Sequence, residues 1–205
     1  MSRRRTVILA AGDFPKKGSA ARKALNEAVR VICCDGAADV YRRRTGKEPF
    51  AVVGDCDSLK GRFSNVVADA DQDTNDLEKA VQYCKGHGWK YPLVVGAFGK
   101  REDHSIGNVF RALDLELEVL TDTGRFVPVM GKAVFRVKKG TPVSVFATDP
   151  ATKAKSKGLQ WKLDGVNFKN LYCATLNRAS ASKVEILSNK RILIYIPINE
   201  KRDNI

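Results

Sequence analysis

The chain has 205 residues, of which 43% are hydrophobic and 29% charged, the balance of a globular protein rather than a disordered one. Its net charge of +13 favours anionic partners or substrates, and no apolar run reaches the roughly 18 residues of a transmembrane helix. The five cysteines form no C-x-x-C pair, and their odd number favours reduced thiols in a cytoplasmic protein over disulfides or a zinc site.

The first 120 residues alternate short β-branched runs with amphipathic stretches, which predicts alternating strands and helices. Strands are expected at residues 6–11, 30–34, 50–53, 91–95 and 116–120, and helices at residues 19–28, 37–44, 75–87 and 104–113. The clearest helix has one apolar stripe, formed by Leu77, Ala80, Val81 and Cys84. Apolar strands separated by helices are typical of a mostly parallel, Rossmann-like sheet with flanking helices.

Beyond Thr121 the pattern changes to strands joined by Gly, Asn and Lys turns, with no convincing helix. Strands are expected at residues 125–129, 133–137, 142–146, 183–187 and 191–196, and a polar, Lys-rich loop at residues 149–157. We therefore predict two domains: an α/β domain at residues 1–122 and a smaller all-β sandwich at residues 123–205.

The positive charge is spread along the sequence in short clusters, at residues 3–5, 42–44, 100–101, 138–139 and 153–157. None of these clusters carries the interleaved aromatic residues of a base-stacking surface. We interpret the charge mainly as a solvated surface with some attraction for phosphate. Neither nucleic acid nor a membrane is therefore expected as a partner.

Carboxylates follow the predicted strands of the first domain. Asp35, Asp55 and Asp57 each come just after a strand, and Asp103 lies beyond a later one. Ligands of open parallel sheets bind outside the carboxyl ends of the strands, so we expect these acids in one crevice. Two or three such carboxylates suit Mg²⁺, which takes its other ligands from water and substrate phosphates. Taken alone, residues 54–58 are equally consistent with a turn that has acidic caps.

A second acidic stretch, residues 71–76, comes just before a predicted helix and enters its first turn. Its Asp, Thr and Asn side chains are good N-caps, and acids there complement the helix dipole. Three carboxylates in six residues nevertheless exceed what one cap needs. The alternative is that the additional carboxylates bind a metal or a hydroxyl-bearing substrate.

A third stretch, residues 96–105, combines glycines after a strand, two cations and a helix start. Backbone N–H groups together with Lys100 and Arg101 fit a phosphate cradle. The pattern is neither G-x-G-x-x-G nor a P-loop, which makes it weak evidence by itself. His104, at the helix start, is more typical of a structural histidine than of a catalytic base.

In this order, the stretches resemble the motifs of the thiamine pyrophosphokinase family. The matching motifs are Asp35-Gly36-Ala37, Gly54-Asp55-Cys56-Asp57-Ser58-Leu59, Asp71-Gln72-Asp73-Thr74-Asn75-Asp76, Gly99-Lys100-Arg101-Glu102-Asp103-His104 with Asn108, and Gly158-Leu159-Gln160-Trp161-Lys162-Leu163. The likeness covers most of the chain, and an ordered series of motifs is far more specific than any one of them.

The resemblance implies an α/β catalytic domain followed by a β-sandwich that binds thiamine and forms a homodimer, with the active site near the subunit interface. It implies the reaction of ATP and thiamine to AMP and thiamine diphosphate. In that reaction the thiamine hydroxyl attacks the β-phosphorus of ATP, and AMP leaves.

The resemblance also implies roles for individual residues. Mg²⁺ would be held by Asp35, Asp55, Asp57 and Asp76, and the last three of these would be catalytic. The nucleotide would be arranged by Lys100, Arg101, Asp103, His104 and Asn108. Thiamine would be contacted by Gln72, Asp73, Trp161 and Asn177. Trp161 offers an aromatic face to a cationic heterocycle, with a tryptophan in the β-domain core as the alternative.

Two positions depart from the family pattern. Lys100 stands in place of the second glycine of Gly-Gly-Arg, which restricts the loop backbone. Leu176-Asn177 replaces a Ser-Asn pair, if residues 175–178 are the matching stretch, and so loses a hydroxyl from the acceptor site.

Two other functions are compatible with parts of the sequence. One is a related pyrophosphokinase acting on another hydroxymethyl heterocycle, such as a pterin. The other is a basic nucleic-acid-binding protein with an enzyme-like domain, which gives no reason for the ordered carboxylates.

Overall fold

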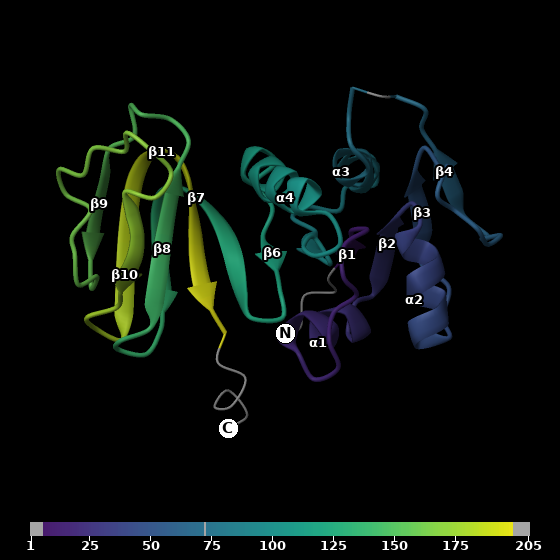
Figure 1. Ribbon diagram of the computed structural model, residues 1–205, viewed down its shortest axis with the longest axis horizontal. Helices are drawn as coiled ribbons and strands as arrows, with labels where there is room; N and C mark the ends of the chain where they lie inside the picture. The colour runs from purple at the N-terminus through teal and green to yellow at the C-terminus, as the bar shows by residue number, and fades with distance from the viewer. Residues whose placement is uncertain (1–5, 72, 199–205) are drawn as a thin grey trace. The chain divides into compact units, whose positions relative to one another are not determined.

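The computed structural model describes residues 6–71 and 73–198 (Figure 1). The chain divides into two compact units, Met1–Asp122 and Thr123–Ile205. All helices of the described ranges belong to the first unit, so the expected mixed α/β fold is confirmed. None of those helices is both long and apolar enough to span a bilayer.

The first unit contains a parallel sheet with the strand order β6-β5-β1-β2-β3-β4. Its strands are β1 (Thr6–Leu9), β2 (Arg30–Cys34), β3 (Ala51–Gly54), β4 (Val66–Ala68), β5 (Leu93–Val95) and β6 (Val119–Leu120). Strands β1, β3 and β5 are buried throughout, because helices cover both faces of the sheet, and this explains their uninterrupted apolar runs. The direction of winding reverses between β1 and β5.

Four helices flank this sheet: α1 (Ala20–Asn26), α2 (Ala37–Thr45), α3 (Asp76–Gly86) and α4 (Glu102–Asp114). In Figure 1, α1 and α2 lie on one side of the strands and α3 and α4 on the other. The predicted Ser19 cap is present, and Asn75 accepts a hydrogen bond from the Glu78 N–H at 3.0 Å to cap α3. The apolar stripe predicted for α3 is buried.

Several bounds in the first unit differ from the prediction. Strands β5 and β6 begin late, because Tyr91 and Glu116 adopt positive φ angles of 53° and 60° that interrupt a strand. Helix α4 begins two residues early, which places Asp103 and His104 in its first turn. Strand β4 was not predicted, since it has only three residues and none of them is fully buried.

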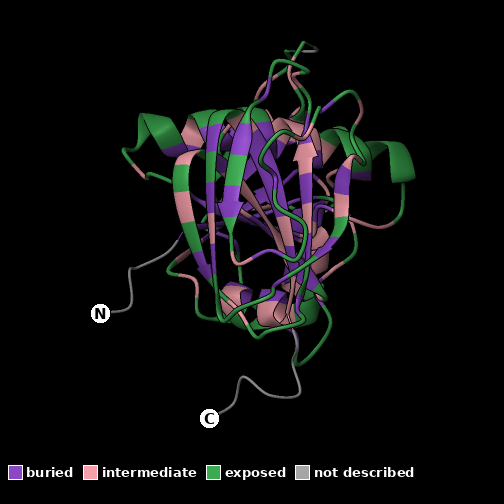
Figure 2. Cartoon of the chain, turned by 90° about the vertical axis from the view of Figure 1, so that its left-hand side faces the viewer, coloured by how far each residue is buried: buried purple, intermediate pink, exposed green. Residues whose placement is uncertain are grey.

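The second unit consists of antiparallel strands around its own core. These are β7 (Gly124–Arg136), β8 (Pro142–Ala147), β9 (Ala154–Lys157), β10 (Ala174–Arg178) and β11 (Lys183–Pro197). Their order is β10-β8-β11-β7, and β9 pairs with β11. Buried and exposed residues alternate along the strands, as Figure 2 shows, and the buried ones form one hydrophobic cluster.

Three expectations for the second unit were wrong. Strands β7 and β11 each join two predicted strands into one. The predicted loop at residues 149–157 contains β9, in which Ala154 and Ser156 are buried while Lys155 and Lys157 are exposed. Pairing with β11 outweighs the weak strand propensity of these residues. Strand β10 was also missed.

Candidate active site

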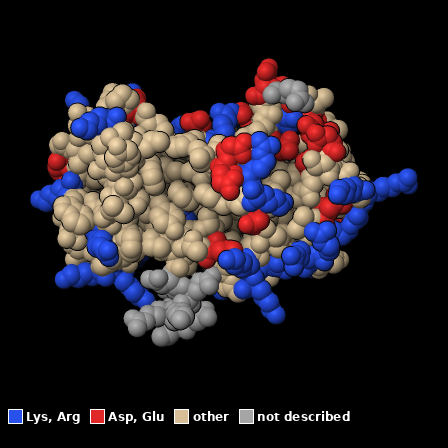
Figure 3. All heavy atoms as spheres, viewed as in Figure 1, with Lys and Arg blue, Asp and Glu red and all other residues tan. Residues whose placement is uncertain are grey.

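The site lies at the carboxyl ends of the parallel strands in the first unit. Ala10 follows β1, Asp35 follows β2 and Asp55 follows β3, so the chain delivers these residues to one edge of the sheet. This edge, near the point where the winding reverses, is where open α/β sheets bind ligands. Figure 3 shows acidic and basic side chains intermingled on the visible face of this unit.

Three of the predicted metal ligands converge. Asp35, Asp55 and Asp57 each offer a carboxylate oxygen, and these oxygens lie within 4.8 Å of one another. Asp35 is 4% exposed, and its Oδ2 accepts a hydrogen bond from the Ser58 N–H at 3.2 Å. Its Oδ1 is buried and has no hydrogen-bond partner among the described residues. An ionised carboxylate in that position lacks a compensating positive group.

Asp76 joins the cluster from the first turn of α3, and Gly54 makes this possible. A Cβ atom at Gly54 would lie 3.0 Å from Asp76 Oδ1 and 3.1 Å from Asp35 Cβ. A backbone hydrogen bond from Asp55 is one of the influences that lower the pKa of Asp76. Because a Cβ would be in tight contact with both acids, the glycine eases their approach to each other at the end of β3.

The electrostatics of the cluster favour a cation. Burial raises the pKa of the Asp35 carboxyl, and the nearby Asp57 and Asp55 carboxylates raise it further. Burial likewise raises the pKa of Asp76, with Asp55 and Asp35 adding to the effect. The donors are all carboxylate oxygens, one of them unpartnered, which fits a hard ion such as Mg²⁺.

Lys79 is a member of the site that the sequence analysis missed. It is 3% exposed, its Nζ donates to the Asp69 carbonyl oxygen at 2.8 Å, and it lies 4.0 Å from Asp76 Oδ1. This ammonium group lowers the pKa of Asp76 against the other influences. The sequence feature that indicates its role is its position in α3, three residues after Asp76 and beside the apolar stripe. A lysine is seldom buried at such a position unless an acidic side chain lies nearby.

A cleft of about 410 Å³ opens beside the cluster. Its lining includes Asp55, Asp71, Asp76 and Lys79 together with Asp103, His104 and Asn108 of α4. The structure therefore brings part of the predicted nucleotide-binding set to the same hollow as the acids. Lys100 and Arg101 are not among the lining residues.

Two glycine-containing turns pack together at this edge. The Gly12 N–H donates to the Gly96 carbonyl oxygen at 2.9 Å, and a Cβ at Gly99 would lie 2.1 Å from Asp13 Oδ2. Lys100 adopts a positive φ of 59°, where the family has glycine, and its Nζ donates to the Ala11 carbonyl oxygen at 2.7 Å. Its side chain thus bridges the two turns.

The start of α4 holds an exposed ion pair. Arg101 Nη2 lies 2.6 Å from Asp103 Oδ2, and this contact lowers the pKa of Asp103 to about 2. The Asp103 carboxylate also accepts the His104 N–H at 2.9 Å. Asn108 is anchored one turn later, because its Nδ2 donates to the Ala97 carbonyl oxygen at 3.2 Å.

In the stretch at residues 71–76, some side chains form hydrogen bonds within a turn, and one side chain joins the acidic cluster. Asp71 accepts hydrogen bonds from the Asp73 N–H at 3.0 Å and from Thr74 Oγ1 at 2.6 Å. Asp73 is exposed, and Gln72 lies outside the described residues. Within the described part of this stretch, Asp76 is the carboxylate that joins the acidic cluster.

The remaining predicted residues, Trp161 and Asn177, lie in the second unit. Trp161 is 55% exposed, so the alternative of a core tryptophan is wrong. Asn177 is buried, donates to the Trp161 carbonyl oxygen at 2.7 Å and accepts the Trp161 N–H at 3.2 Å. It therefore supports Trp161 at the surface. Leu176, the residue before Asn177, is 84% exposed and has a φ of 60°.

Comparisons with known proteins agree across both units. The family model "Thiamin pyrophosphokinase, catalytic domain" matches residues 21–119. The model "Thiamin pyrophosphokinase, substrate-binding domain" matches residues 124–195. A curated relative, thiamine pyrophosphokinase 1 of Oryza sativa subsp. japonica, is 25% identical over 82% of this chain and 78% of its own length.

Solved structures resemble the fold. Yeast thiamin pyrophosphokinase aligns with a TM-score of 0.76 at 14% identity, over 99% of this chain and 89% of the yeast chain. A thiamin pyrophosphokinase family protein from Enterococcus faecalis aligns with a TM-score of 0.74 at 13% identity, over 95% and 99% of the two chains. Identities this low show the fold alone.

The Asp35→Asn substitution tests the repulsion in the acidic cluster. The pKa of Asp35 is higher in the folded protein than its ordinary value of 3.8. When the pH rises above 3.8, ionisation of Asp35 therefore favours the unfolded state and destabilises the folded, metal-free protein. Removing that charge should increase the free energy of unfolding at neutral pH, on the order of 1 kcal/mol. The gain should disappear as the pH falls to the ordinary aspartate range.

Urea unfolding in the presence of a chelator measures this effect at both pH values. Glu27→Gln, on the exposed end of α1, is the matched control and should change little. A loss of stability in Asp35→Asn at neutral pH would show that the ionised carboxylate is not under strain.

Proposed function

The chain belongs to the thiamin pyrophosphokinase family, and we propose that the acidic cluster of Asp35, Asp55, Asp57 and Asp76 is its catalytic centre. The protein is an enzyme that transfers diphosphate from ATP to thiamine. In this reaction the thiamine hydroxyl oxygen forms a bond to the β-phosphorus, the bond between the α-β bridging oxygen and the β-phosphorus breaks, and AMP leaves with that oxygen. The observation that carries the proposal is the buried, unpartnered Asp35 Oδ1 within 4.8 Å of two further carboxylates.

The four carboxylates would hold Mg²⁺. When bound, the metal would neutralise negative charge on the diphosphate, which is the main requirement of phosphoryl-type transfer. Asp55, Asp57 and Asp76 would also orient the attacking hydroxyl. Lys79 supplies the one buried positive charge beside the acids in the described part of the cleft, and so would lower the pKa of Asp76 and favour its ionised form.

The nucleotide would lie against the start of α4. The N-terminal backbone of this helix favours anions, and Ala10 and Ala11, which precede the Gly12 turn, line the cleft. Arg101 would exchange its ion pair with Asp103 for a phosphate contact, while Lys100 would hold the turns. Asp103, His104 and Asn108 line the hollow and would position the rest of ATP.

Thiamine would be contacted by Gln72 and Asp73 in the first unit and by Trp161 in the second. The exposed indole of Trp161 suits a cationic heterocycle, and Asn177 would fix its backbone. The first unit would act as a Rossmann-like catalytic domain, residues 1–122, and the second as a sandwich domain, residues 123–205. The latter would form a homodimer with the site near the interface.

A cytoplasmic location is also proposed. Cys33, Cys34, Cys56, Cys84 and Cys173 are all free thiols. Burial raises the pKa of Cys34 and Cys84, so these thiols stay protonated and unreactive. Such cysteines are typical of a reducing compartment.

Asp55→Asn and Asp57→Asn test the metal-ligand roles. Each should lower the rate of AMP formation from ATP and thiamine by about a hundredfold or more, because a missing ligand weakens charge neutralisation at the transferred group. Circular dichroism should show an unchanged fold, since neither side chain is in the core. Rates near those of Glu27→Gln in both variants would contradict these roles.

The same assay checks the acceptor. Replacing thiamine by 6-hydroxymethylpterin should abolish AMP formation. Turnover with the pterin and none with thiamine would overturn the assignment of the acceptor while leaving the acidic site intact.

Lys79→Met tests the buried ammonium. Because Lys79 lowers the pKa of Asp76, its removal should shift the acid limb of the pH–rate profile to higher pH. We expect kcat near neutral pH to fall about tenfold, as one charge at about 4 Å implies. Lys79→Arg keeps the charge and should retain the profile. An equal loss in both variants, without a shifted limb, would show that Lys79 only packs.

A further inference from the structure

The excess positive charge is concentrated in the second unit. Residues 1–122 contain 20 Lys and Arg against 18 Asp and Glu, whereas residues 123–205 contain 16 against five. Within residues 123–198, which the structure describes, the counts are 14 against three. The excess of cations over acids therefore belongs mainly to the small β unit, and the positions of its cations on the strands decide what they do.

Strand pairing gathers several of these cations on one face. Residues directly opposite each other in antiparallel strands have side chains on the same side of the sheet. The facing positions place Leu187 opposite both Lys155 and Lys132, Glu185 opposite Lys157 and Val134, and Lys183 opposite Arg136. We call this exposed surface of β9, β11 and β7 the basic face; its cations are Lys132, Arg136, Lys155, Lys157 and Lys183.

One acid is found among these facing positions. Glu185 pairs with Lys132 and Lys183, and the Lys183 ammonium holds the pKa of the Glu185 carboxyl below its usual range. This carboxylate stays ionised and cancels one of the five charges. The basic face therefore keeps a net positive charge. It complements a surface of dense negative charge.

Aliphatic side chains lie among the lysines. Val134 is 47% exposed and Leu187 is 51% exposed, both at facing positions of the basic face. Met130, 65% exposed, continues the same side of β7. No aromatic residue occupies the facing positions of the basic face, so this face lacks the stacking platforms that single-stranded nucleic acids use.

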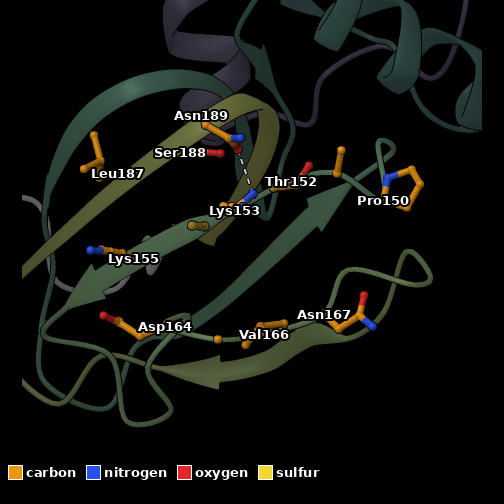
Figure 4. A pocket seen from close by; sticks show the side chains of 13 residues that line it. Pro150, Thr152, Lys153, Lys155, Asp164, Val166, Asn167, Leu187, Ser188 and Asn189 are labelled. Carbon is orange, nitrogen blue, oxygen red and sulfur yellow. Dashed lines mark hydrogen bonds between the residues drawn. The ribbon is translucent and has the colours of Figure 1, made fainter.

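A pocket of about 650 Å³ extends this surface. Figure 4 shows Lys153 and Lys155 between the segment that carries Asp164 and the bend that carries Ser188 and Asn189. Asn189 Oδ1 accepts the Lys153 N–H at 2.7 Å, which fixes the bend beside β9. Leu187 lines the pocket as well as the basic face, so the two are continuous.

The charge is not uniform over the unit. In Figure 3, the side of the second unit turned to the viewer is mostly uncharged, with Lys and Arg side chains near its margins. In Figure 1, which has the same orientation, the strands on this side of the second unit are β8 and β10. Five of the 14 Lys and Arg residues in the described part of this unit lie on the basic face.

We propose that the second unit docks through the basic face on bilayers that contain anionic phospholipids. Lysines near a membrane surface are attracted by its negative potential, and their stems lie along apolar surface while the ammonium groups reach the headgroups. Exposed Val134 and Leu187 then contact the boundary with the acyl chains, as on amphipathic interfacial surfaces. Nucleic acid offers the same charge but no use for these aliphatic side chains. The proposal departs from the expectation of no membrane partner.

The test compares two charge-matched variants of the full chain. One carries Lys155→Gln, Lys157→Gln and Lys183→Gln; the control carries Lys23→Gln, Arg43→Gln and Lys85→Gln on helices of the first unit. Co-sedimentation uses vesicles of equal parts phosphatidylserine and phosphatidylcholine, with pure phosphatidylcholine as the neutral surface. The first variant should bind the anionic vesicles on the order of a hundredfold more weakly than wild type, and the control far less so.

A second pair of substitutions separates lipid from nucleic acid. Val134→Thr with Leu187→Thr keeps the charges and should weaken vesicle binding several-fold without changing binding to a DNA duplex. No wild-type binding to anionic vesicles, or equal losses in the two charge variants, would overturn the proposal. So would duplex binding that exceeds vesicle binding and ignores the threonine pair. AMP formation should be unchanged in all these variants, which keeps this test independent of the proposed active site.

Discussion

The structure of the site depends on one electrostatic constraint: carboxylates are forced together where parallel strands end. Asp35 is buried, and Asp35 and Asp76 lie against the same side of Gly54. Burial and neighbouring carboxylates raise the pKa of Asp35 and of Asp76, and Asp35 Oδ1 has no partner among the described residues. Such a cluster is costly for the isolated chain, and a cation relieves that cost. The catalytic proposal follows from this imbalance.

The surrounding structure holds the acids in place without neutralising them. Ser58 donates to Asp35, and Asn75 caps α3 so that Asp76 is directed toward β3. Lys79 supplies a partial counter-charge from within the helix. The start of α4 completes the cleft, with Asp103, His104 and Asn108 among the lining residues. One cleft is thus lined both by proposed metal ligands and by groups proposed to hold the nucleotide.

Much of this could be predicted from the sequence, because strand ends and acidic motifs are local features. The convergence of Asp35, Asp55 and Asp57 follows from parallel topology. The burial of Lys79 is harder to predict, since a lysine in an amphipathic helix usually extends to solvent and its spacing from Asp76 is a weak signal. Strand β9 was missed because its Lys-rich sequence is stabilised by pairing with a distant strand. For the same reason, the basic face becomes visible only once the register is known.

The most direct test of the central claim is thermal unfolding of the wild-type protein over a Mg²⁺ titration at neutral pH, with Asp35→Asn beside it. If the cluster is a strained metal site, Mg²⁺ binds the folded state and raises the wild-type Tm saturably. The variant should start from a higher Tm and respond much less. A wild-type Tm that does not change with Mg²⁺, or an equal rise in both proteins, would contradict the account.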